Sequence, residues 1–114
     1  MAIFNVTPII IYMYMANEII NSDVVQGLII SLRNQQVLLD RDVAMLYGVS
    51  TKVINQAVKN NPEKFPARYL FTLEDREKIE LVKNFDRFES MKHSTVNPTA
   101  FTERGLYMLA TILK

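Results

Sequence analysis

The sequence has no cysteine, no tryptophan and a single histidine among its 114 residues. Without a thiol, the chain forms no disulfide and supplies no thiolate ligand to a metal, as expected of a protein that stays in a reducing cytoplasm. His93 has no cysteine or acidic residue beside it in the sequence, and a lone imidazole in a polar stretch is a poor ligand or base. We therefore predict a cytoplasmic protein with no cofactor and no metal site.

Neither sign of charge dominates the chain, and no apolar run is long enough to cross a membrane. Thirteen Lys and Arg residues against twelve Asp and Glu residues leave a net charge of +1. The apolar run Ile9–Met15 is far shorter than the roughly 20 residues of a membrane-spanning helix. Residues 1–14 carry no charged side chain, so the basic start of a signal peptide is absent. We expect residues 1–14 to be a non-native or disordered extension, the natural start to be Met15, and residues 15–114 to form one domain.

The stretch Asp40–Asn61 has the pattern of two short helices joined by a tight turn. Asp40 is a candidate N-cap of the first helix, and Gly48 is suited to end that helix because glycine adopts positive φ without a Cβ penalty. Ser50 is then the expected N-cap of the second helix. This combination is typical of a helix-turn-helix unit. Apolar residues recur at helical spacing along one face of each helix, namely Val43, Leu46 and Tyr47 on the first and Val53, Ile54 and Ala57 on the second.

The second helix of this unit carries a polar face opposite its apolar one. Asn and Gln side chains can pair with the adenine edge, and lysine reaches phosphates or guanine. Residues 41–68 hold five bases against two acids, a local positive patch of the kind that favours phosphate. A surface helix with no ligand would also be polar on one side. Here, however, the turn, the packing residues and the polar face all fit a helix-turn-helix that contacts DNA. The candidate DNA-contacting residues are Thr51, Lys52, Asn55, Gln56, Lys59, Asn60, Arg41, Lys64 and Arg68.

The remaining chain predicts an α+β fold, in which a small antiparallel β-hairpin or three-stranded sheet and two further helices support the helix-turn-helix unit. β-Branched and aliphatic runs at Val24–Leu32 and Val37–Leu39 predict the two hairpin strands. Tyr69–Leu73 predicts a third short strand that returns to the hairpin.

A helix is expected directly after the third strand. Thr72 followed three residues later by Asp75 is a capping-box pattern, and it opens a helix that runs through Phe85. Ile79 and Val82 supply the inner edge of this helix, and the charged residues around them form a solvated face.

The end of the sequence predicts a mobile loop and then a last helix. Asp86–Pro98 is polar and lacks periodicity, so we expect a loop there. Thr102 is the expected N-cap of a strongly apolar helix. This helix either packs on the domain core or meets a second copy of the chain, which would give a homodimer.

Three stretches together resemble the KilA-N DNA-binding family of bacteria and their prophages, specifically its phage "open reading frame six, N-terminal" subgroup. They read LLDRDVAMLYGVSTKVINQAVKNN, EKFPARYLFTLEDRE and PTAFTERGLYMLATIL. The resemblance covers roughly Val25 to Leu113 and implies a DNA-binding domain, often found at the front of antirepressor-like or regulatory phage proteins. Carried onto this sequence, it implies that the face from Thr51 to Asn60 touches DNA. It also implies that four residues shape the motif, namely Asp40, Ala44, Tyr47 and Gly48.

Two functions other than an enzyme follow from these patterns. The first is sequence-selective binding of double-stranded DNA in phage-associated transcription control. The second is an antirepressor-type module that binds a repressor protein and does not itself read DNA, which the apolar last helix favours. An enzyme is not expected, because no histidine, cysteine or glycine-rich phosphate loop joins the acids that could hold the metal of a nuclease, namely Asp40, Asp42, Glu63 and Glu103.

Overall fold

The structure, a computed structural model, describes residues 22–113. These residues form the predicted α+β fold, with a four-stranded antiparallel sheet in place of the predicted two or three strands. The predictions for residues 1–14 and for a start at Met15 lie outside the described residues. In chain order the helices (α), 3₁₀ turns (η) and strands (β) are α2 (Ser22–Leu28), β1 (Ile30–Leu32), β2 (Gln35–Leu39), α3 (Asp40–Tyr47), α4 (Thr51–Lys59), η1 (Pro62–Lys64), β3 (Leu70–Thr72), α5 (Asp75–Asn84), η2 (Asp86–Met91), β4 (Thr99–Phe101) and α6 (Glu103–Ile112).

The strands lie in the order β1-β2-β4-β3, and all neighbours are antiparallel. β1 and β2 form the predicted hairpin. Its two turn residues, Arg33 and Asn34, have positive φ (53° and 61°), as tight antiparallel turns require. β4 is absent from the sequence prediction because its three residues directly follow a polar stretch. It lies between β2 and β3, with Phe101 opposite Leu38, so β3 reaches the hairpin only through β4.

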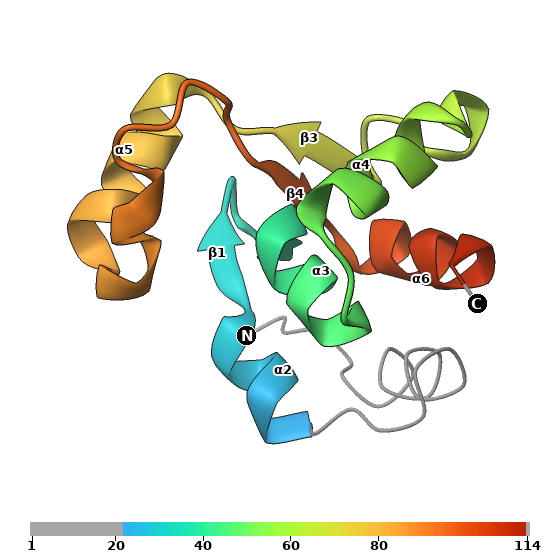
Figure 1. The fold of residues 1–114 in the computed structure, drawn as a ribbon, viewed down its shortest axis with the longest axis horizontal. Coiled ribbons are helices and arrows are strands. Elements are labelled where there is room, and N and C mark those ends of the chain that lie inside the picture. The colour runs from blue at the N-terminus through green and yellow to red at the C-terminus, as the bar shows by residue number, and fades with distance from the viewer. Residues whose placement is uncertain (1–21, 114) are drawn as a thin grey trace.

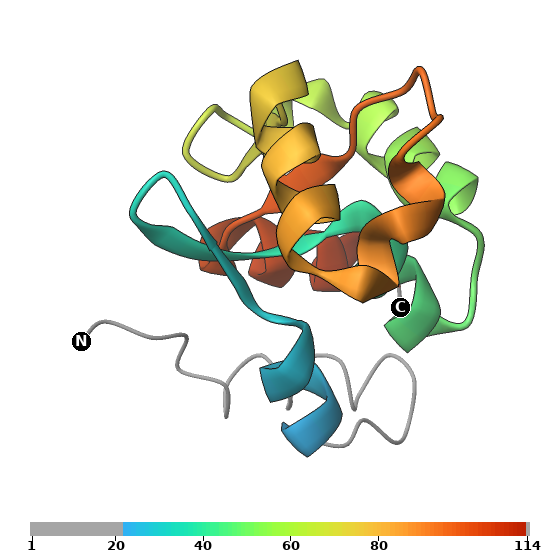
Figure 2. The ribbon, with the colours of Figure 1, turned by 90° about the vertical axis from the view of Figure 1, so that its left-hand side faces the viewer.

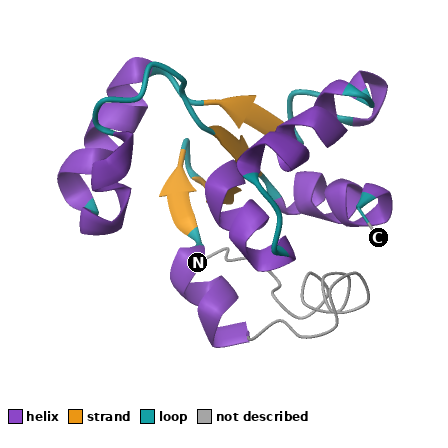
Figure 3. Ribbon diagram, in the orientation of Figure 1, coloured by secondary structure: helices purple, strands orange, loops and turns teal. Residues whose placement is uncertain are grey.

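Helices cover both faces of the sheet, with α3, α4 and α6 on one side and α5 and η2 on the other (Figure 1 and Figure 3). Alternate residues of β2 divide between the two sides, as strand geometry requires. Leu38 is buried in the same cluster as Ile54 of α4, whereas Val37 and Leu39 are buried with Phe88 of η2. The sheet therefore separates two apolar cores, and the α3–α4 unit belongs to one of them.

α6 docks closely on the chain just before β3. The predicted N-cap is confirmed, since the Thr102 hydroxyl accepts a hydrogen bond from the Gly105 N–H at 3.4 Å. The Thr102 N–H in turn donates to the Tyr69 carbonyl at 3.0 Å. A Cβ at Gly105 would lie 2.0 Å from that same carbonyl oxygen, so only glycine permits this approach. Phe65 meets Phe101 edge-on beside this contact, with ring centroids 6.5 Å apart.

The predicted strand Val24–Leu32 is wrong over its first part, which forms α2, and only its end forms β1. Val25 and Leu28, three residues apart, are buried in the core, while Val24 is exposed. Helical spacing, and not alternation, therefore places the apolar residues of this segment. The β-branched residues of this segment favour a strand, but a helix buries Val25 and Leu28 against the core.

The predicted start of α5 is also wrong, and its predicted inner edge is confirmed for Val82 but wrong for Ile79. The N-cap is Glu74, whose N–H donates to the Glu77 carboxylate at 2.8 Å, so the helix opens two residues later than a cap at Thr72 implies. Leu81 faces the core, whereas Ile79 is 62% exposed. Val82 packs partly buried against the same core, so the inner edge runs through Leu81 and Val82 and not through Ile79.

Charged side chains occupy part of the buried face of α5, contrary to the prediction of a fully solvated charged face. Glu77 and Lys78 are both buried. Glu77 accepts two hydrogen bonds from Arg33 of the hairpin turn, at 2.8 and 2.9 Å, and the Lys78 ammonium donates to the Ser94 carbonyl. Burial of these charges depends on partners from distant segments, which no local pattern reveals.

The predicted mobile loop Asp86–Pro98 is wrong over its first half, where η2 forms. Phe88 and Met91 of η2 are buried in the core that α5 covers. Arg87 pairs with Asp42 at 2.9 Å and also donates to the Leu28 carbonyl at 3.3 Å. These contacts fix η2 against α3 and the end of α2.

Candidate nucleic-acid interface

The turn between α3 and α4 is built as the sequence predicts around Gly48. Gly48 adopts left-handed φ and ψ of 69° and 32° and ends α3. The Gly48 N–H donates to the Met45 carbonyl at 3.1 Å, and the Val49 N–H donates to the Ala44 carbonyl at 3.0 Å. These two bonds form a Schellman motif, which satisfies the last carbonyls of α3 and turns the chain sharply.

α4 begins at the predicted cap and buries a single face. The Ser50 hydroxyl accepts a hydrogen bond from the Val53 N–H at 3.3 Å. Ile54 is fully buried, and Ala57 and Val58, three and four residues on, are half-buried. The prediction that Val53 belongs to this apolar face is wrong, because its side chain is 44% exposed. Val53 therefore lies among the outward side chains of α4.

Asp40 has a different role from the predicted N-cap. The N-cap position is Leu39, and Asp40 is the first residue of α3. The buried Asp40 carboxylate accepts from the Arg41 N–H at 2.8 Å and from Nδ2 of Asn55 at 3.0 Å. Since a carboxylate only accepts, the Asn55 amide must turn its nitrogen toward it. Asp40 thus ties the start of α3 to the middle of α4.

The predicted polar face of α4 divides into an exposed part and a half-buried part. Lys52, Gln56, Lys59 and Asn60 are exposed, whereas Thr51 and Asn55 are half-buried. Gln56 donates from Nε2 to Oδ1 of Asn60 at 3.0 Å, so the two amides form a pair one helical turn apart. The face is neither covered by the hairpin nor sealed by α6 at its exposed positions.

Two of the three flanking bases, Arg41 and Lys64, lie near the two ends of α4, and Arg68 lies in the chain just before β3. Arg41, half-buried in the first turn of α3, donates to the Ser90 hydroxyl at 3.2 Å. Lys64 is exposed in η1, just beyond the C-terminal end of α4 (Figure 1). Arg68 is also exposed, with its guanidinium 5.9 Å from the ring centroid of Tyr69. Basic side chains therefore occur at both ends of the exposed polar face.

Asp42 does not offset this positive charge at the surface. Its side chain is only 5% exposed and is paired with Arg87, with both carboxylate oxygens within 3.0 Å of Nη1. Burial raises the pKa of Asp42, and the hydrogen bond from Arg87 opposes that rise. Of the two acids in residues 41–68, Glu63 alone is exposed.

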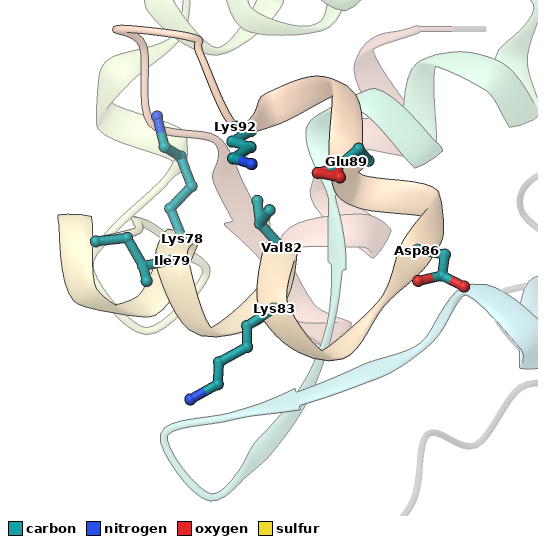
Figure 4. A pocket seen from close by; sticks show the side chains of 7 residues that line it. All are labelled: Lys78, Ile79, Val82, Lys83, Asp86, Glu89 and Lys92. Atoms are coloured by element: carbon teal, nitrogen blue, oxygen red, sulfur yellow. The ribbon is translucent and has the colours of Figure 1, made fainter.

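A shallow hollow of about 560 Å³ lies elsewhere, between α5 and η2 (Figure 4). Its floor is aliphatic, from Ile79 and Val82, and its rim mixes lysines with Asp86 and Glu89. Lys78 and Lys83 extend in opposite directions in Figure 4, and the Lys78 ammonium is held by the Ser94 carbonyl. The charged groups do not converge on one point, so the hollow lacks the arrangement of a catalytic or ligand site.

Within residues 22–113, no cluster of three or more His, Cys, Asp or Glu side chains is placed to hold a metal ion. No helix in this part of the chain has the length and apolarity needed to cross a membrane. Among curated proteins and among solved structures, no chain matches this sequence. The family model of the ORF6N domain does match, over residues 27–112, a range that includes α3, α4 and every candidate contact residue. The chain therefore belongs to the ORF6N domain family.

Proposed function

We propose that this ORF6N domain is a non-enzymatic, sequence-selective binder of double-stranded DNA in phage or prophage transcription control. The family associates the chain with phage proteins. The observation that carries the proposal is the exposed amide and lysine face of α4, on a helix fixed from behind by buried Ile54 and by the Asn55–Asp40 hydrogen bond. A helix held in this way can present its side chains to a major groove with little loss of conformational freedom.

The exposed polar residues of α4 and its C-cap divide into two chemical classes. Gln56 and Asn60 carry amides that can both donate to and accept from a base edge, and we assign them to sequence readout. Lys52 and Lys59, with Lys64 and Arg68 beyond the helix, supply the contacts to phosphate that position the domain. The hydrogen bond from Gln56 to Asn60 holds the two amides together in the absence of DNA.

Selection of bound sequences from a random DNA pool at a stated salt concentration tests this proposal. A recovered motif is expected, and a palindrome would also report the spacing of two copies on the duplex. Gln56→Ala should relax the preference, whereas Lys52→Ala or Lys59→Ala should weaken binding to all sequences and lower the salt slope by about one each. Unchanged binding in all three variants would place the contact surface elsewhere, and a chain that selects no sequence would refute readout.

The second candidate is a protein-interaction module, and a hollow beside α6 favours it. The hollow, of about 290 Å³, is lined by two tyrosines and a methionine together with two polar side chains, namely Tyr69, Tyr107, Met108, Arg104 and Thr111. Such a surface suits another protein, which would be either a repressor or a second copy of the chain. Capture of a purified phage repressor without any DNA shift would support the antirepressor role. A dimer in sedimentation that Met108→Glu dissolves would support the homodimer.

A further inference from the structure

A third hollow lies where α3, the first turn of α4 and the end of η2 meet. Its volume is about 330 Å³. Polar side chains from three stretches of the chain surround it. They include Arg41 of α3, Thr51 and Asn55 of α4, and Ser90 and Asn97 of the stretch from the end of η2 to Pro98. Hydroxyl, amide and guanidinium groups are those that proteins use most often on the sugar-phosphate backbone of DNA.

The charge of this hollow distinguishes it from the hollows around α5. Arg41 contributes a guanidinium, and the acid in the lining, Asp40, is 5% exposed and already accepts two hydrogen bonds. By contrast, Glu80 lies in the exposed rim of the hollow beside the hairpin, and Glu89 in that of the hollow between α5 and η2. The other two hollows also hold bases, including Lys83 and Lys92 in one and Arg76 in the other, but exposed carboxylates lie among them. In this hollow the lining acid is buried, so a phosphate would meet the Arg41 guanidinium and neutral donors.

The segment 92–98 closes one side of the hollow and is held from behind by α5. Asn97 donates from Nδ2 to Oδ1 of Asp75 at 2.8 Å, and the Lys78 ammonium donates to the Ser94 carbonyl. The Ser94 hydroxyl also bonds both the N–H and the carbonyl of Val96 at 3.2 Å. These bonds fix the segment in place although it has no regular secondary structure.

The segment leads from η2 to β4 (Figure 2), and it shares the lining of the hollow with Thr51 and Asn55 of α4. Val96 lines the hollow and is 73% exposed, the most exposed of the large apolar side chains that the structure describes as exposed. An aliphatic side chain at this position can contact a deoxyribose or a thymine methyl group. The polar face of α4 and segment 92–98 thus form two neighbouring elements of one surface.

We propose that this hollow seats the sugar-phosphate backbone of the DNA strand that borders the groove entered by α4, with Ser90 and Val96 as contact residues in addition to Arg41. The inference rests on the proposed function and extends it to a second, non-helical element. It also gives Arg41 a defined role, because its hydrogen bond to Ser90 already aims the guanidinium at the hollow.

A matched pair of charge substitutions tests the proposal. Val96→Glu and Ile79→Glu each replace an exposed aliphatic side chain by a carboxylate, the first in the hollow and the second on α5. We expect Val96→Glu to weaken binding to the selected DNA by about tenfold and Ile79→Glu to change it less than about twofold. Thermal unfolding of both variants checks that each remains folded. Val96→Lys should strengthen binding.

The absence of cysteine permits a direct test of proximity. Val96→Cys and Ile79→Cys each carry one thiol, to which an iron chelate that cleaves DNA can be attached. Cleavage of the strand next to the selected motif is expected from position 96 and not from position 79.

The outcomes separate the two proposals. Equal losses of DNA binding in Val96→Glu and Ile79→Glu, or no DNA cleavage from position 96, would overturn the proposal that the hollow binds the DNA backbone. Loss of binding in Lys52→Ala together with full binding in Val96→Glu would overturn the seat and leave readout by α4 standing. A wild-type chain that binds no DNA would overturn both.

Discussion

Nδ2 of Asn55 donates a hydrogen bond to Oδ2 of Asp40 at 3.0 Å, joining the middle of α4 to the first residue of α3. Asn55 belongs to the predicted polar face of α4, but this hydrogen bond attaches its side chain to the body of the domain. Gln56, one residue on, points outward and bonds only along its own helix to Asn60. Substitutions at these two neighbouring amides should therefore have different effects.

Asn55→Ala should lower the free energy of unfolding by about 1–3 kcal/mol, because the buried Asp40 carboxylate loses a partner. Gln56→Ala, at an exposed position, should change it by less than about 0.5 kcal/mol. Asn55→Asp should be worse than Asn55→Ala, since it sets two carboxylates at hydrogen-bond distance. Urea denaturation followed by circular dichroism measures all three. Equal stability of the two alanine variants would contradict the tie between α3 and α4.

Gly105→Ala should be among the most destabilising single substitutions in the domain. The new Cβ would lie 2.0 Å from the Tyr69 carbonyl oxygen, so α6 must move away from the chain before β3. We expect a loss of about 3 kcal/mol or more. Gly27→Ala is the matched control, because a Cβ there meets nothing within 4 Å inside α2 and should stabilise that helix by roughly 0.5–1 kcal/mol. Thermal melting measures the stability of both variants. A loss of stability in Gly27→Ala as large as that in Gly105→Ala would contradict the packing argument.

Tyr47→Phe should leave the domain as stable as the wild type or stabilise it by about 1 kcal/mol. The Tyr47 hydroxyl is buried and has no hydrogen-bond partner within residues 22–113, so its removal relieves a desolvation penalty.

The same tyrosine gives a pH prediction. Burial raises the pKa of Tyr47 from 10.0 to about 12. The unfolded chain then loses its proton first, so stability should fall as pH rises through that window. Tyr47→Phe should remove this part of the decline in chemical denaturation at alkaline pH. If stability fell equally with rising pH in the wild type and in Tyr47→Phe, the Tyr47 hydroxyl would have to reach solvent.

Glu77 and Arg33 predict a change at the acid end of the pH range. The hydrogen bonds from Arg33 lower the pKa of Glu77 from 4.5 to about 2. The unfolded chain takes up its proton first as pH falls, so stability is lost between these two values. Arg33→Met should destabilise the domain at neutral pH and flatten this loss. Arg76→Met is the control, because the Arg76–Glu74 pair is exposed on both sides and should contribute little. Identical acid profiles for Arg33→Met and the wild type would exclude the pair as the cause.

Local signals predicted the turn between α3 and α4 and the N-caps of α4 and α6. Gly48, Ser50 and Thr102 act through their own backbone conformation or through a hydroxyl that reaches three residues along, so their roles follow from neighbouring residues. The exposure of Lys52, Gln56 and Lys59 followed from the same helical period that buries Ile54.

Long-range contacts explain what the sequence did not reveal. β4 is three residues long and is defined by its neighbours β2 and β3. The inner face of α5 depends on Arg33, 44 positions before Glu77, and the burial of Phe88 and Met91 on the core beneath α5. No sequence signal marks Ser90 and Val96, the two residues proposed above to contact DNA, because tertiary packing alone brings them beside α4.

The position of β4 between β2 and β3 also has a consequence for synthesis on the ribosome. α3 and α4 are adjacent in the chain and can pair as soon as they emerge, whereas β2 and β3 have no shared neighbour until Thr99–Phe101 follow. A nascent or prematurely terminated product ending before these residues would carry unpaired strand edges and an uncovered Leu38, both of which invite aggregation. The sheet can therefore close only after β4 has been synthesised.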